Sequence, residues 1–139
     1  MLKMQFKINW EKLTQMNKII NTDKAPKAIG PYSQGYLCGN TLYCSGQIAI
    51  NPETNEFING TIEEQTNQIL KNIGALLEAA GFTFEDVVKT TCFISDMKDF
   101  SVFNNLYEKA FVSKPARSCI AAKELPKGAL AEIEVIAVK

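Results

Sequence analysis

The longest regular pattern of apolar positions in the chain runs from residue 62 to residue 80. Apolar side chains recur there at positions 62, 69, 70, 73, 76, 77 and 80, the spacing of one face of a helix. The segment Thr61–Glu64 has the Thr-x-x-Glu arrangement of a capping box, and Gly81 is a typical terminating residue. The pattern predicts a long helix that packs its apolar face against a sheet and has no catalytic role.

Two strand-like runs, residues 32–38 and 41–47, flank the dipeptide Gly39-Asn40. Both residues of that dipeptide tolerate a positive φ angle, which the two-residue turn of a tight hairpin requires. The pattern predicts an antiparallel hairpin. Ser45-Gly46 lies near its end, where the glycine predicts either a β-bulge or a close approach by a ligand or a neighbouring backbone.

The last third of the chain predicts a strand, a helix and two further strands. Residues 87–94 are dense in β-branched side chains and predict a central strand. We expect Asp99 to cap a second helix and Lys114-Pro115 to end it, because proline cannot continue a helix. A strand that contains Arg117 follows, and a loop rich in proline and glycine connects it to a final strand over residues 132–138. The apolar face of the second helix is expected to consist of Phe100, Phe103, Leu106, Tyr107, Ala110 and Phe111.

The remaining segments are less regular. Residues 18–21 predict a short strand, whereas residues 22–31 and 51–60 carry the proline, glycine and asparagine residues of exposed loops. Residues 1–17 show neither a helical nor a strand period and predict an N-terminal extension. We therefore expect a single compact domain over residues 18–139, with an α+β fold in which two helices cover one face of a sheet.

The composition argues against several classes of protein. The 15 basic and 15 acidic side chains cancel, so no net charge attracts a nucleic acid backbone or an anionic lipid surface. Histidine is absent, which excludes the Ser-His and Cys-His nucleophile systems and histidine-based zinc sites. The four cysteines form no C-x-x-C pair, so we expect no metal site, and thiols that fill the core and stay reduced inside the cell.

Charged residues stand out in the last two predicted strands. Arg117 lies at the beginning of one strand, and Glu132 and Glu134 lie on the next. An arginine at a strand start is usually a surface ion pair, but its planar guanidinium also matches a carboxylate in two parallel hydrogen bonds. The residues alone leave two interpretations open, an Arg117–Glu132 pair across the sheet and a site that binds a carboxylate.

Six short motifs occur in a fixed order along the chain. They are Gly-Pro-Tyr-Ser-Gln at 30–34, Ser-Gly-Gln at 45–47, Asp-Val-Val-Lys-Thr-Thr at 86–91, Pro-Ala-Arg-Ser-Cys at 115–119, Leu-Pro-Lys-Gly-Ala at 125–129 and Glu-Ile-Glu at 132–134. Together they resemble the RidA/YjgF family of enamine/imine deaminases from about residue 18 onward, and the ordered set is more specific than any single motif. The resemblance implies a chorismate-mutase-like α+β fold, assembled as a homotrimer with clefts between adjacent subunits.

The resemblance also implies an activity, the hydrolytic deamination of 2-imino acids such as 2-iminobutanoate and 2-iminopropanoate to 2-keto acids and ammonia. In such a site Arg117 would bind the substrate carboxylate, while Glu132 would hold the attacking water near the backbone carbonyl of Cys119. Glu132 beside an arginine is expected to stay ionised. The residues that would shape the pocket are Tyr32, Ser45, Gly46 and Asn104. No cofactor is implied.

Two alternatives come from other classes of protein. Proteins that resemble this chain have also been described as single-stranded-RNA endoribonucleases and translation inhibitors, which would need an electropositive groove and stacking aromatics. A trimer that binds small carboxylates in the same cleft without turnover is the other alternative. We expect a small imino acid and further copies of the chain as partners, and neither nucleic acid nor a membrane. A cytoplasmic location is expected, because residues 1–17 lack the arginine and serine of an organellar targeting peptide.

Overall fold

The computed structural model describes residues 17–139, so all but the last residue of the predicted N-terminal extension lies outside the described residues. Six strands of the described part form one mixed sheet. They are β1 (Asn17–Ile20), β2 (Gly35–Cys38), β3 (Thr41–Gln47), β6 (Val87–Ile94), β7 (Ala116–Ala121) and β8 (Ala131–Val138). Their order is β1-β2-β3-β8-β6-β7, and every neighbouring pair is antiparallel except β6 and β7, which are parallel.

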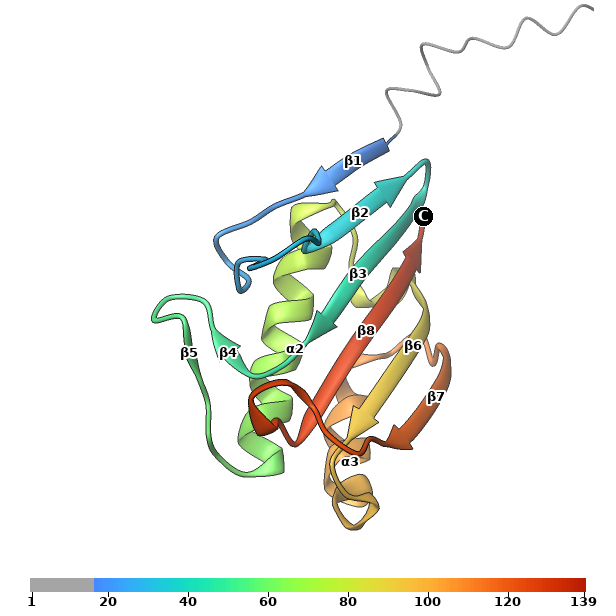
Figure 1. Ribbon diagram of the computed structural model, residues 1–139. Coiled ribbons are helices and arrows are strands. Elements are labelled where there is room, and N and C mark those ends of the chain that lie inside the picture. Colours follow the sequence, from blue (N-terminus) through green and yellow to red (C-terminus); the bar gives the residue numbers. More distant parts are fainter. Residues whose placement is uncertain (1–16) are drawn as a thin grey trace, which may run out of the picture.

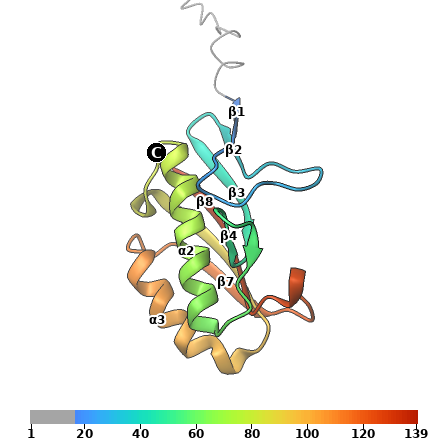
Figure 2. The ribbon, with the colours of Figure 1, turned by 90° about the vertical axis from the view of Figure 1, so that its left-hand side faces the viewer.

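Helices α2 (Ile62–Ala79) and α3 (Phe100–Ala110) pack on the same face of this sheet (Figure 1 and Figure 2). The predicted capping box is present at the start of α2, where the Thr61 hydroxyl accepts from the Glu64 backbone N–H and the Glu64 carboxylate accepts from the Thr61 N–H. Gly81 ends the helix in a left-handed conformation with a φ of 79°. The predicted α+β class, with two helices on one face, is confirmed.

The core lies between the helices and the facing side of the sheet. Every second residue of β8 is buried, from Ala131 to Ala137, and faces the helices. The largest fully buried side chains include Phe103, Phe111, Leu42, Ile69, Ile73, Leu76, Leu77, Ile94 and Ile133. Within residues 17–139, no helix has both the length and the apolar character needed to span a membrane.

The hairpin begins later than predicted. β2 starts at Gly35 and not at residue 32. The side chain of the preceding residue, Gln34, bonds to the loop, while its backbone carbonyl accepts from the Ser45 N–H of β3. Its buried amide donates to the carbonyls of Thr22, Ala25 and Pro26 and accepts from the Thr22 N–H. This side chain therefore holds the loop between β1 and β2 in a fixed shape.

Two further details differ from the sequence prediction. The expected loop over residues 51–60 contains a short ladder of β4 (Ile50–Asn51) and β5 (Glu56–Phe57), closed by Asn55 in a left-handed conformation with a φ of 59°. Asp99 occupies the N-cap position of α3 but makes no capping hydrogen bond. Asp96 instead accepts from the Lys98 N–H and caps the short 3-10 turn that precedes α3.

Candidate functional site

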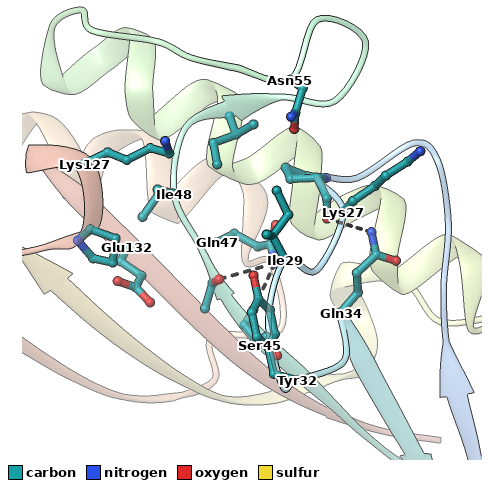
Figure 3. Close-up of a pocket in the computed structure, with 14 residues that line it drawn as sticks. Lys27, Ile29, Tyr32, Gln34, Ser45, Gln47, Ile48, Asn55, Lys127 and Glu132 are labelled. Atoms are coloured by element: carbon teal, nitrogen blue, oxygen red, sulfur yellow. Dashed lines mark hydrogen bonds between the residues drawn. The ribbon is translucent and has the colours of Figure 1, made fainter.

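A cavity of about 550 Å³ lies between the loop after β1, the end of β3 and the turn before β8 (Figure 3). That loop and that turn both project from the side of the sheet that the helices leave open (Figure 2). Four of the residues predicted from the sequence line this cavity, namely Tyr32, Ser45, Gly46 and Glu132. The chain thus brings together residues from three segments that are distant in sequence.

Ser45 and Gly46 form a bulge, since the register between β3 and β8 shifts at this point. The Ser45 hydroxyl donates to the backbone carbonyl of Ser33 and so ties β3 to the loop that carries Tyr32. A methyl group added at Gly46 would collide with the carboxylate of Glu132. The glycine therefore lets this carboxylate lie directly against the backbone of β3. The predicted bulge is confirmed, and the close approach is made by a side chain and not by a ligand or a neighbouring backbone.

Glu132 is half-buried in the cavity, and its environment disfavours the charged form. Burial, and then the negative charge of Glu134, raise the pKa of Glu132 above its ordinary value. Glu134 lies two residues further along β8 on the same face. No lysine or arginine within residues 17–139 forms an ion pair with Glu132. The expectation that an adjacent Arg117 keeps Glu132 ionised is therefore wrong for the single chain.

Arg117 lies on the opposite face of the sheet from Glu132. It pairs in register with Thr90, and Thr90 pairs with Val135, which is 1% exposed and faces the helices. Side chains alternate between the two faces along a strand, so an even-numbered residue of β8 such as Glu132 faces the other way. The sequence left open an Arg117–Glu132 pair across the sheet, and this geometry rules it out within one chain.

Arg117 lines a second cavity, of about 480 Å³, together with Asn104. Its Nη1 donates to Oδ1 of Asn104 at 2.7 Å, and its Cζ lies 4.5 Å from the centroid of the Tyr107 ring. The predicted site residues therefore form two groups, one around Glu132 and one around Arg117.

Cys119 lies two residues after Arg117 on β7 and faces the same side of the sheet. It is partly buried. Burial raises the pKa of its thiol, and the positive charge of Arg117 offsets only part of this effect. Burial also raises the pKa of Cys44 and Cys92 to about 12, so these thiols are protonated at neutral pH. None of the three is an activated nucleophile.

Sequence reasoning missed three residues of these cavities. Gln34 was assigned to a strand, and no sequence signal shows that a glutamine amide will hold three loop carbonyls. Tyr107 was assigned to an apolar helix face, although its ring contacts Arg117. Lys127 lines the cavity of Glu132 from a left-handed position with a φ of 58°. Its place in the Leu-Pro-Lys-Gly-Ala motif, between Pro126 and Gly128, was the sequence signal that could have found it.

The described residues offer little for binding a metal. Residues 17–139 contain no group of three or more cysteine, aspartate or glutamate side chains arranged to hold an ion. The chemistry available in the two cavities is instead that of one carboxyl group with a raised pKa, one anchored guanidinium, backbone amides and hydroxyl groups. Such a set suits the binding of a small anion and the activation of water.

Comparisons with known proteins show the family of the chain. The sequence model described as Endoribonuclease L-PSP matches residues 22–139. A RutC family protein of Pyrococcus horikoshii is 50% identical over 89% of this chain and 99% of its own length. The 2-iminobutanoate/2-iminopropanoate deaminase of Homo sapiens is 44% identical over 89% of this chain and 91% of its own. The crystal structure of E. coli TdcF with bound serine has a TM-score of 0.83 at 41% identity, over 88% of this chain and 98% of that one. The chain belongs to the RidA/YjgF/L-PSP family.

Proposed function

We propose that this protein hydrolyses reactive 2-imino acids, among them 2-iminobutanoate and 2-iminopropanoate, to 2-keto acids and ammonia. The observation that carries the proposal is the carboxyl group of Glu132, half-buried in a cavity, without a basic partner in the described chain and with a raised pKa. Such a group exchanges protons with water or with an amine nitrogen more readily than an ordinary carboxylate at neutral pH. The named activity of the human relative supports the same chemistry.

The roles of the residues follow from this chemistry. Arg117 binds the substrate carboxylate and orients the imine carbon. In its ionised form Glu132 takes a proton from water as the water oxygen adds to C2 of the protonated imine, which gives a carbinolamine. Glu132 then passes this proton to the nitrogen. Ionised again, it takes the hydroxyl proton as the carbonyl forms and the C2–N bond breaks to release ammonia, and it returns that proton to the solvent. The imine carbon is already electrophilic, so the protein needs only to position carboxylate and water.

Two copies of the chain are needed to complete such a site. Arg117 and Glu132 lie on opposite faces of one sheet, so a single substrate molecule meets both only where the Arg117 cavity of one copy faces the Glu132 cavity of another. We therefore propose a homotrimer with a shared site at each interface. Cys119 lies on the edge strand β7, and in this proposal its backbone carbonyl faces a neighbouring copy.

An RNA-cleaving function is the second candidate, favoured by the description of the family and by exposed aromatic side chains. Tyr36 and Tyr43 pair across β2 and β3 and are 43% and 49% exposed, as a base-stacking surface requires. The same tyrosines lie on the face that the trimer would bury, and the chain has no net charge to attract phosphates. We therefore rank this candidate below the deaminase.

The test is a coupled assay. A threonine dehydratase or an amino acid oxidase generates the imine, semicarbazide traps it, and the purified protein competes with the trap by releasing ammonia and keto acid. The same preparation is offered single-stranded RNA in parallel. Faster loss of imine with intact RNA supports the proposal. Binding of 2-oxobutanoate without turnover indicates a carboxylate-binding protein, and RNA cleavage that survives repurification without imine hydrolysis indicates a nuclease.

A further inference from the structure

Arg117 rests against the aromatic side chains of α3. Its Cζ lies 4.5 Å from the ring centroid of Tyr107 and 5.5 Å from that of Phe100, and its Nη1 donates to Asn104. A guanidinium over an aromatic face gains a cation–π attraction that grows as water is excluded. The three α3 residues are spaced by four and then three positions, so one face of the helix fixes both the plane and the rotation of the guanidinium.

Tyr107 is in turn fixed to the sheet. Its hydroxyl oxygen lies 2.6 Å from that of Thr90, and the two residues are 7% and 0% exposed. Thr90 is also the register neighbour of Arg117 on the adjacent strand. Each of the three residues therefore contacts the other two. Arg117 lies over the Tyr107 ring, Tyr107 is hydrogen-bonded to Thr90, and Thr90 pairs with Arg117 across β6 and β7. A buried hydroxyl without a hydrogen-bond partner costs free energy. This cost opposes any movement of the Tyr107 ring away from Thr90.

We propose that Tyr107, held by Thr90, is a positioning residue that presets the Arg117 guanidinium for a two-pronged grip on the substrate carboxylate. The inference rests on the proposed function, in which Arg117 binds that carboxylate. A free arginine side chain gives up considerable rotamer freedom when it binds, whereas one already held on a fixed ring gives up less. Tyr107 therefore tightens binding through its hold on Arg117.

The effect belongs to binding and not to the chemical step. The substrate keeps its carboxylate unchanged from the ground state to the transition state, so a better grip on it stabilises both states equally. Loss of the ring should therefore raise KM and leave kcat nearly unchanged. A purely structural role for Tyr107 would lower the melting temperature without shifting this balance.

The test compares Tyr107→Leu with the matched control Phe103→Leu. Phe103 is a fully buried aromatic residue on the same helix. Its ring centroid lies 6.1 Å from that of Tyr107, but it makes no cation–π contact with Arg117 within residues 17–139. Both variants should lose stability. Only Tyr107→Leu should raise KM for 2-iminobutanoate, by about fivefold to tenfold, the size expected from losing a partly desolvated cation–π contact. Titration of 2-oxobutanoate followed by NMR should show a matching loss of affinity.

A second pair of variants tests the link to the sheet. Tyr107→Phe and Thr90→Val each remove one hydroxyl of the buried pair while keeping the shape of the side chain. Each should raise KM modestly, and the double variant should raise it no further, because both changes break the same contact.

The outcomes separate this inference from the proposed function. If the wild-type protein binds 2-oxobutanoate but turns over no imine, the proposed function fails, and the affinity of Tyr107→Leu still decides the positioning role. Unchanged affinity and KM in Tyr107→Leu overturn the inference, as does an equal rise in KM in Phe103→Leu. A wild-type protein that neither turns over imine nor binds 2-oxobutanoate overturns both.

Discussion

Arg117 and lysine carry the same charge, so replacing one by the other tests geometry and not charge. In Arg117→Lys the ammonium cannot make the two parallel hydrogen bonds of a guanidinium or stack on Tyr107 in the same way. We expect kcat/KM for 2-iminobutanoate to fall by an amount equivalent to about 2–4 kcal/mol, with an unchanged circular dichroism spectrum. Lys98→Gln, at an exposed lysine beside Asp96, is the control. A folded Arg117→Lys variant with nearly full turnover contradicts the role of Arg117.

Glu134 gives the site a testable pH dependence. Burial is the largest cause of the raised pKa of Glu132 and the charge of Glu134 is the next, so Glu134→Gln should lower that pKa towards its ordinary value. As a base Glu132 must be ionised, and activity is lost as the pH falls through its pKa. The acidic limb of the kcat–pH profile should therefore move to lower pH in Glu134→Gln. A limb that stays in place, or moves to higher pH, contradicts the coupling between the two glutamates.

The same pKa shift affects stability with a definite sign. The folded state binds the Glu132 proton more tightly than the unfolded state, because the folded pKa is the higher one. The resulting stabilisation is fully present below the unfolded pKa and is lost as the pH rises through the folded pKa. Ionised Glu132 therefore costs stability at neutral pH, as expected of a group kept for its chemistry and not for the fold.

Gly46 provides a substitution that should separate activity from folding. A methyl group at Gly46 would meet the flexible end of Glu132 and push the carboxylate away from β3. We expect Gly46→Ala to fold with a nearly unchanged melting temperature and to lose most of its kcat. Gly60→Ala is a matched control, because its methyl group would meet the carboxylate of Glu64 in the capping box of α2, which does not line the Glu132 cavity. Equal activity in both variants would contradict the importance of the Gly46–Glu132 contact.

At the scale of elements, the periodic patterns were reliable and the irregular connections were not. The capping box and Gly81 bounded α2 correctly because local chemistry decides where a helix begins and ends. The late start of β2 and the β4–β5 ladder depend on contacts between segments far apart in the chain, such as those of Gln34. Sequence alone carries no signal for such contacts.

The candidate site shows the same division. Its residue types were found through the family motifs, but the sequence did not reveal that Arg117 and Glu132 face opposite ways. Their strands are separated in the sheet by β6, so their relative facing depends on two registers, and a shift of one residue in either would reverse it. Spacing along the chain cannot supply these registers.

The loop between β1 and β2 gives a prediction at this scale. Gln34 makes four hydrogen bonds to that loop, which carries Tyr32 and much of the cavity wall. In Gln34→Ala the three carbonyls lose their donor, and we expect the free energy of unfolding to fall by about 2–4 kcal/mol. The Thr22 amide donates to the Gln34 side chain, so its hydrogen exchange should become faster in this variant. The KM for 2-iminobutanoate should rise. Unchanged exchange at Thr22 contradicts the anchoring role.

At the scale of the whole molecule, the sheet face opposite the helices indicates assembly. Ile19, Tyr36, Tyr43 and Ile136 form one row across β1, β2, β3 and β8 on this face. Ile19 is 58% exposed, Tyr36 is 43% exposed and Tyr43 is 49% exposed. Apolar side chains gathered in this way on one face of a sheet mark a surface for another protein chain. Light scattering should report an oligomer, most simply the trimer proposed above, and a stable monomer at micromolar concentration would contradict it.

A mixing experiment tests whether the site is shared between copies. Arg117→Lys lacks the carboxylate grip and Glu132→Gln lacks the proton carrier, so each variant alone should be nearly inactive. In mixed trimers, some interfaces pair an intact Arg117 of one copy with an intact Glu132 of the next. In every trimer that contains both variants, one of the three cyclic interfaces has the productive pairing, so isolated mixed trimers should show about a third of the wild-type activity per site. The variants are co-expressed with different tags, and mixed oligomers are isolated by two affinity steps. Recovery of activity only in mixed oligomers supports a shared site, whereas fully assembled mixed oligomers that remain inactive would show that Arg117 and Glu132 do not meet across an interface.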